Sequence, residues 1–137
     1  MNVRRVGPGD EELWVATVAR LGEKPAEESA LFLADPSTVA VSATDEGEPV
    51  GWAWGHRLRR PDGRWMLLLY ELDVLPEWQR RGIGKALVDE MKQIAIDTGC
   101  TAMWLVTEHD NAPALATYRS SGGTWSETAD RVVAWEL

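Results

Sequence analysis

The chain has 137 residues, 45% of them apolar, which suits one domain with a buried core and excludes a disordered chain. Its net charge is −8, from 22 acidic and 14 basic residues. This charge argues against nucleic acid as a partner, because binding to phosphates needs a basic face. It suits a cationic substrate, or it serves solubility.

The apolar residues follow helical and strand periods in turn, separated by Gly, Pro and Asp. The predicted elements, in chain order, are a strand at 2–6, helices at 7–22 and 25–35, strands at 37–44, 50–58 and 65–75, a helix at 83–97, a strand at 101–107, a helix at 111–123, and strands at 124–128 and 131–137. Asp10 is expected to cap the first helix, and Pro25 to begin the second.

The strand at 65–75 is apolar on both faces, which predicts a central place in a sheet, and the strand at 101–107 also reads as buried. A strand, a crossover helix and a further strand predict a parallel pair here, with the rest of the sheet antiparallel. The order β-α-α-β-β-β-α-β-α-β-β predicts a mixed α/β (α+β) fold, with a single domain spanning 1–137.

The only cysteine is Cys100, so no intrachain disulfide can form, which fits a reducing compartment. The first residues lack the apolar stretch of a signal peptide, and no run has membrane-spanning length. We therefore expect a cytoplasmic protein with no membrane partner. The two histidines stand far apart without companion ligands, so no metal site is expected.

The segment EWQRRGIGKALVDEM, residues 77–91, places bases and glycines where a helix begins. Backbone N–H groups at a helix start lack partners and carry the positive end of the helix dipole. Glycine lets a phosphate approach the backbone, and Arg80, Arg81 and Lys85 add positive charge, so the segment can hold a diphosphate. The alternative is an ordinary basic loop.

Two common phosphate motifs do not match this segment. A P-loop needs Ser or Thr after the lysine, where this chain has Ala86. A dinucleotide fingerprint needs a third glycine, where this chain has Leu87. A second basic segment, RLRRPDGR at 57–64, reads as a solvated hairpin tip, or as a place that attracts the adenosine 3′-phosphate or a partner.

The run Gln79-Arg80-Arg81-Gly82-Ile83-Gly84 resembles the Q/R-x-x-G-x-G/A signature of the GNAT superfamily of N-acetyltransferases. LDVLPEWQRRGIGKALVDEM resembles the strand, Pro-containing connection and helix around that signature. NAPALATYRSSGG resembles the family's next motif, in which Asn begins a helix and Tyr follows about two turns later. The element order also agrees. The resemblance implies the GNAT fold, with splayed central parallel strands, and acetyl transfer from acetyl-CoA to a primary amine.

The resemblance also implies a cofactor site. The loop would bind the pyrophosphate of acetyl-CoA, the strand end would pair with the pantetheine arm, and an Asn would contact the pantetheine. The implied residues are Gln79, Arg80, Arg81, Gly82, Ile83, Gly84 and Lys85 for the loop, Leu72, Asp73 and Val74 for the strand end, and Asn111. A CoA-binding module without catalysis is the alternative to an enzyme.

Two catalytic residues are implied. Tyr118 would be the general acid for the departing thiolate, or a helix residue packed on the sheet with its hydroxyl group capped. Glu71 would take the proton of the amine, directly or through water, or would only bind the amine; burial would raise its pKa toward a useful range. Asp73 should lie on the same face as Glu71, with Tyr70 and Leu72 on the opposite face.

The acceptor is less defined. Glu108, His109 and Asp110 could meet a cationic substrate, or they form a solvated loop in which Asp110 or Asn111 caps a helix. The segment YELDV at 70–74 resembles small aminoglycoside 3-N-acetyltransferases, which implies a small cationic amine, with a protein or peptide amine as the alternative. Homodimers are common in this fold, and the expected edge strand at 131–137 would offer a pairing surface.

Overall fold

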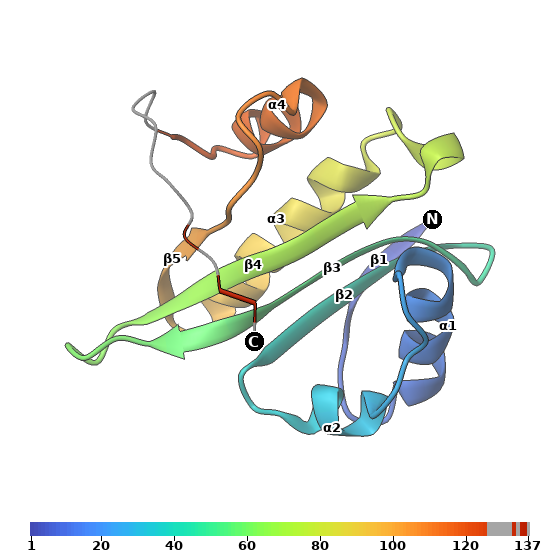
Figure 1. The fold of residues 1–137 in the computed structure, drawn as a ribbon, viewed down its shortest axis with the longest axis horizontal. Coiled ribbons are helices and arrows are strands. Elements are labelled where there is room, and N and C mark those ends of the chain that lie inside the picture. The colour runs from blue at the N-terminus through green and yellow to red at the C-terminus, as the bar shows by residue number, and fades with distance from the viewer. Residues whose placement is uncertain (126–132, 134, 137) are drawn as a thin grey trace.

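A single mixed sheet organises the chain (Figure 1). The computed structural model describes residues 1–125, 133, 135 and 136, and within them the strands form one five-stranded sheet in the order β1-β2-β3-β4-β5. The elements are β1 (Asn2–Val6), α1 (Glu11–Leu21), α2 (Ser29–Ala34), β2 (Thr38–Asp45), β3 (Glu48–Arg59), β4 (Trp65–Val74), a 3₁₀ turn η1 (Pro76–Trp78), α3 (Ile83–Asp97), β5 (Cys100–Trp104) and α4 (Ala112–Ser120).

The sheet has the predicted mixture of directions. The pairs β1–β2, β2–β3 and β3–β4 are antiparallel, and β4–β5 is parallel with α3 as the crossover. The predicted element order is confirmed from β1 to α4. The strands predicted at 124–128 and 131–137 fall mainly on residues outside the described part. No helix in the described residues is both long and apolar enough to cross a membrane.

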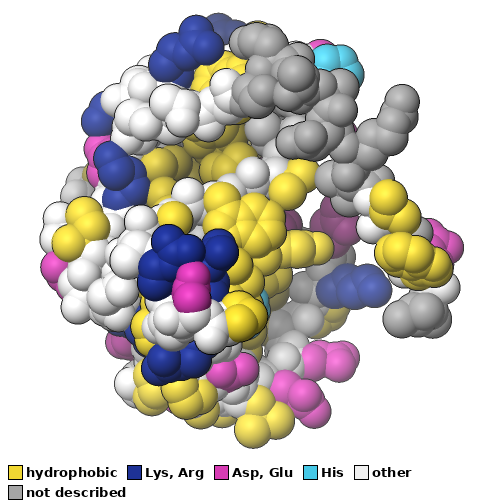
Figure 2. Space-filling model, turned by 90° about the vertical axis from the view of Figure 1, so that its left-hand side faces the viewer, with side chains coloured by type: hydrophobic (Ala, Val, Ile, Leu, Met, Phe, Trp, Pro, Cys, Tyr) yellow, Lys and Arg dark blue, Asp and Glu magenta, His cyan; other side chains and the backbone are white. Residues whose placement is uncertain are grey.

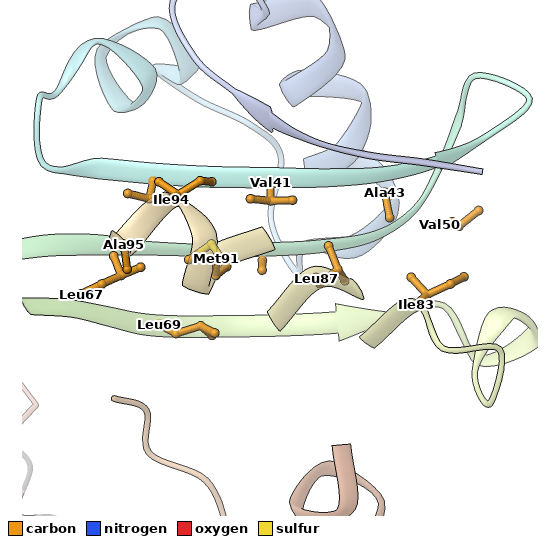
Figure 3. Close-up of a cluster of buried hydrophobic side chains, with 12 residues drawn as sticks. Val41, Ala43, Val50, Leu67, Leu69, Ile83, Leu87, Met91, Ile94 and Ala95 are labelled. Carbon is orange, nitrogen blue, oxygen red and sulfur yellow. The ribbon is translucent and has the colours of Figure 1, made fainter. Parts of the chain in front are cut away.

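Helices cover both faces of the sheet (Figure 1). The larger core lies between the sheet and α3, whose apolar residues recur at helical spacing, including Ile83, Leu87 and Met91, each at most 2% exposed (Figure 3). These side chains meet Leu67 and Leu69 of β4. A second core on the opposite face joins α1 and α2 to the sheet through buried aromatic side chains.

The starts of the first two helices differ from prediction. α1 begins at Glu11, and the carboxylate of Asp10 accepts a hydrogen bond from the Gly7 N–H at 3.0 Å instead of capping the helix. α2 begins at Ser29 rather than at Pro25, because Glu28 adopts a left-handed backbone with φ of 54° that interrupts the helical path.

A bulge in β4 decides which way its side chains point. Trp54 of β3 pairs with Glu71 and Gly55 pairs with Leu69, so Tyr70 is an extra residue in β4. Gly55 permits this close approach, since an added Cβ would overlap the Leu68 carbonyl oxygen and lie 2.9 Å from its carbon. The alternation of β4 therefore changes face at Tyr70.

The bulge corrects one expectation. Leu72 packs on the α3 side of the sheet. Glu71 and Asp73 accept hydrogen bonds from tryptophans on the α1–α2 side, so these two acids lie on the face opposite Leu72, as predicted. Tyr70 was expected with Leu72, but its ring packs against the Trp54 ring, with centroids 4.9 Å apart. The extra residue places Tyr70 and Glu71 on the same side.

β5 is more exposed than predicted. Thr101, Ala102 and Trp104 are all exposed, although the strand was expected to be buried. In the part of the chain that the structure describes, β5 is the edge strand and pairs only with β4, which leaves its outer side uncovered.

Candidate active site

The parallel strands separate at one end of the sheet. β4 and β5 pair only from Trp65 with Cys100 to Leu68 with Trp104. Among the described residues, β4 then continues to Val74 with no partner on this side, while the chain after Trp104 leaves the sheet and leads to α4. This is the expected splay, and its opening leaves backbone groups of β4 free to pair with an extended ligand.

The start of α3 lies just beyond this opening. Gly82 is the N-cap residue with φ of 82°, no side chain caps the helix, and a Cβ added at Gly82 would meet no atom within 4 Å. The first amides of α3 thus have no side-chain cap and can receive an anion. Gly84 faces α4 instead, where an added Cβ would lie 3.5 Å from Thr117.

The basic side chains of this loop have neighbours within the chain. The Lys85 ammonium lies 2.7 Å from Asp89, and the Arg81 guanidinium lies over the Trp78 ring, 4.7 Å from its centroid. Arg80 has an unusual backbone φ of 63°. The Gln79 amide donates a hydrogen bond to the Val74 carbonyl at 3.0 Å, which ties the loop to the end of β4.

Helix α4 brings Tyr118 toward the same region. Its side chain is half-buried, and burial first, then the negative charge of Asp73, raises its pKa. A raised pKa keeps the phenol protonated, as a general acid requires. Asn111 begins α4, and its Oδ1 accepts a hydrogen bond from Ala114 N–H at 3.4 Å, so Asn111 rather than Asp110 is the cap.

Cavities lie on both sides of the sheet. One, of about 470 Å³, lies between α3, β5 and α4 and includes Tyr118 and Leu115 in its wall. Figure 2 shows an apolar hollow on this side of the molecule. The other, of about 210 Å³, lies beside β3 and is lined by Trp52, Trp54 and Glu27.

Glu71 and Asp73 form a pair of carboxylates on the second side. The Trp54 indole N–H donates a hydrogen bond to Glu71 at 3.1 Å, and the Trp52 indole N–H donates one to Asp73 at 3.4 Å. Burial first, then the charge of Asp73, raises the pKa of Glu71, and the bond from Trp54 opposes that rise. Glu23 adds a smaller repulsion.

The predicted acceptor residues of the loop before α4 have no described bond to these carboxylates. Glu108, His109 and Asp110 are exposed in the loop before α4, with no described bond to Glu71 or Asp73. No cluster of three or more metal-ligating side chains occurs in the described residues.

The basic side chains at the tip of the β3–β4 hairpin form ion pairs with an aspartate of the same turn. Arg60 and Arg64 both pair with Asp62, and Figure 2 shows basic side chains around an acidic one on this side. The tip is separated from the start of α3 by the length of β4, about 30 Å for ten residues. That distance argues against a contact with a phosphate bound at the α3 loop.

Sequence reasoning missed the two tryptophans that hold the carboxylates. The signal was present, because the W-x-W spacing at 52–54 matches the E-x-D spacing at 71–73 across a predicted hairpin. Only the strand register shows which tryptophan meets which acid.

The fold and the sequence identify the family. The sequence profile of the "Acetyltransferase (GNAT) family" matches residues 10–122, and the chain belongs to this family. A mycothiol acetyltransferase of Arthrobacter sp. (strain FB24) is 30% identical over 141 residues, covering 90% of this chain. The chain spans 42% of the length of that relative.

Another relative has a similar length. Aminoglycoside N(6′)-acetyltransferase type 1 of Stenotrophomonas maltophilia is 29% identical over 146 residues, covering 98% of this chain and 92% of the relative. Its name refers to the 6′ nitrogen, whereas the local resemblance of residues 70–74 is to 3-N-acetyltransferases.

Solved structures share the fold over nearly the whole chain. An aminoglycoside acetyltransferase from an uncultured soil metagenomic sample, in complex with sisomicin, has a TM-score of 0.84 at 20% identity, covering 99% of this chain and 96% of the other. An aminoglycoside N-acetyltransferase in complex with CoA has a TM-score of 0.74 at 18% identity, covering 99% and 98%. At this identity the likeness shows the fold.

Proposed function

We propose that the chain transfers the acetyl group of acetyl-CoA to a primary amine of a small cationic molecule. One observation carries this proposal. β4 and β5 part after Leu68 and Trp104, and the free end of β4 carries the paired carboxylates Glu71 and Asp73 and leads to the uncapped start of α3. The candidate amine-binding groups and the candidate diphosphate site thus lie at the same end of the sheet.

The cofactor side of this site fits acetyl-CoA. The uncapped start of α3 and the open space at Gly82 suit its diphosphate. The free edge of β4 near Leu72 to Val74 suits its amide-containing arm, although the Val74 carbonyl already accepts the Gln79 bond. The side-chain oxygen of Asn111 accepts the hydrogen bond that caps α4, and its amide N–H₂ can donate to a ligand.

The chemistry follows from the two ionisable groups. Acetyl-CoA supplies an activated acetyl group, and the amine attacks it directly in a ternary complex. Glu71 takes the proton that the ammonium loses, directly or through water, and its raised pKa makes it a better base. Tyr118 gives a proton to the leaving thiolate, whose conjugate acid has a pKa near 8.5. The amine gives up two protons in all: Glu71 takes the first before the attack, and the second, lost as the amide forms, replaces the one that Tyr118 gives to the thiolate. The C–N bond forms, the C–S bond breaks, and the protons balance.

An aminoglycoside is the substrate class that we favour. Glu71, Asp73 and Glu23 give the acceptor side a negative charge, which attracts an ammonium group. The aminoglycoside acetyltransferases among the similar proteins support the same choice. A protein or peptide amine is the competing acceptor, and a CoA-binding module without turnover is the competing function.

Calorimetry with CoA and a thiol-release assay with acetyl-CoA test the proposal. The amine panel should include aminoglycosides, polyamines, amino acids and peptides. We expect CoA binding and the fastest thiol release with an aminoglycoside. The absence of CoA binding would overturn the proposal, binding without turnover would support the module, and turnover with peptides alone would move the acceptor to the second class.

A further inference from the structure

Strand β3 presents two tryptophans to two acids of β4. Trp54 pairs in register with Glu71, and Trp52 pairs in register with Asp73, so the two pairs stand side by side. In each pair the indole N–H donates to a carboxylate oxygen, at 3.1 Å for Trp54 and 3.4 Å for Trp52. The repetition at i and i+2 on both strands indicates one arrangement used twice.

The rings are held in place by packing. Trp52 is 5% exposed and belongs to the core beneath α1 and α2. The Trp54 ring contacts the rings of Phe32 and Tyr70, with centroids 5.7 Å and 4.9 Å away. Because packing already restricts the two indole rings, each indole N–H can orient its carboxylate with little further loss of tryptophan side-chain entropy.

The carboxylates need such donors. Glu71 and Asp73 lie two residues apart on one face, and their charges repel. A charge-assisted hydrogen bond to one oxygen of Glu71 favours its ionised form. Because the described bond uses only Oε2, Oε1 remains for an ammonium proton.

We propose that Trp54, supported by Trp52, is a positioning residue that holds Glu71 in the orientation and charge state needed to receive the amine proton. This inference rests on the proposed function, because it assumes that Glu71 handles that proton. The bulge at Tyr70 contributes to this positioning, because it turns Glu71 toward the face of the sheet that carries Trp54.

The direction in which the pKa of Glu71 moves separates a lost hydrogen bond from lost packing, because reduced burial would lower this pKa. Burial raises this pKa most, the charges of Asp73, on the same strand, and of Glu23, in the connection after α1, raise it further, and the Trp54 bond lowers it. Removal of the indole N–H should raise the pKa further, so a higher pH is needed to ionise the base. The acidic limb of the pH–rate profile should therefore move to higher pH.

Trp54→Phe is the test variant, because it removes the N–H and keeps an aromatic ring. Trp65→Phe is the matched control at the other end of β4, where the ring contacts the guanidinium groups of Arg57 and Arg59 rather than a carboxylate. We expect the acidic limb of kcat/KM to rise by about half to one pH unit in Trp54→Phe alone. CoA affinity should stay unchanged in both variants.

A carboxyl ¹³C NMR titration of Glu71 in the free protein, assigned with Glu71→Gln, separates this inference from the proposed function. We expect the Glu71 titration of Trp54→Phe to move upward, whether or not any amine is acetylated. An unchanged titration, or an equal shift in Trp65→Phe, would overturn the inference. If the wild-type protein shows no turnover while the Glu71 titration of Trp54→Phe still moves upward, that result would overturn the proposed function and leave the indole–carboxylate pair established.

Discussion

Replacing Gly82 with alanine should separate the stability of this chain from its affinity for CoA. Gly82 has φ of 82°, where an L-residue costs about 1–2 kcal/mol, so Tm should fall by about 3–8 °C for a chain of this length. An added Cβ meets no protein atom within 4 Å, and the strain comes from the backbone alone. If a diphosphate fills that open space, the methyl group should displace it at a further loss of about 1–3 kcal/mol, or roughly 5- to 150-fold in Kd.

Gly63→Ala is the control for this experiment. Gly63 has φ of 87° and equally empty surroundings, but it lies at the tip of the β3–β4 hairpin. Thermal unfolding by circular dichroism should show similar losses of stability for the two variants. Isothermal titration with CoA should show weakened binding for Gly82→Ala alone. Equal CoA affinity in both variants would refute a diphosphate site at the start of α3.

Three further predictions concern the bulge and the two candidate catalytic groups. Gly55→Ala forces a Cβ into the Leu68 carbonyl and should lower the free energy of unfolding by about 1–3 kcal/mol in urea denaturation. Gly7→Ala, with no neighbour within 4 Å, is the control and should change this free energy little. Equal stability of the two variants would contradict the bulge. Tyr118→Phe should lower kcat by roughly 100-fold with CoA affinity unchanged in calorimetry, and an unaltered kcat would remove Tyr118 as the acid. The pKa of Glu71 in the folded protein is raised above 4.5, so ionisation of Glu71 destabilises the fold as pH rises. Glu71→Gln should therefore raise Tm relative to wild type at pH 8 and not at pH 4. A gain in Tm of the same size at both pH values would show another cause.

The glycine-containing start of α3 was predictable because its signals are local. The two glycines, the bases and the helix period stand within one continuous segment, and the structure places Gly82 at the start of α3 with uncapped amides. The role of Gly84 was not predictable, because its neighbour Thr117 comes from α4, more than thirty positions later in the chain.

The carboxylate site depended on contacts between strands. Alternation along β4 predicted Glu71 and Asp73 on one face, but the sequence of β4 contains no sign of the extra residue at Tyr70. The bulge arises where Gly55 of β3 lets the two backbones approach, and a pattern along one strand cannot report its partner's backbone.

The sequence by itself determined the family, the order of elements through α4 and the glycine-started, uncapped beginning of α3, because hydrophobic period, turn residues and helix-end chemistry act between neighbours in the chain. Tertiary structure alone decided which tryptophan holds which acid, where β4 and β5 part, and which side of the sheet Tyr70 faces. Those features depend on register and packing between distant segments, which set the distances over which hydrogen bonds and charges act.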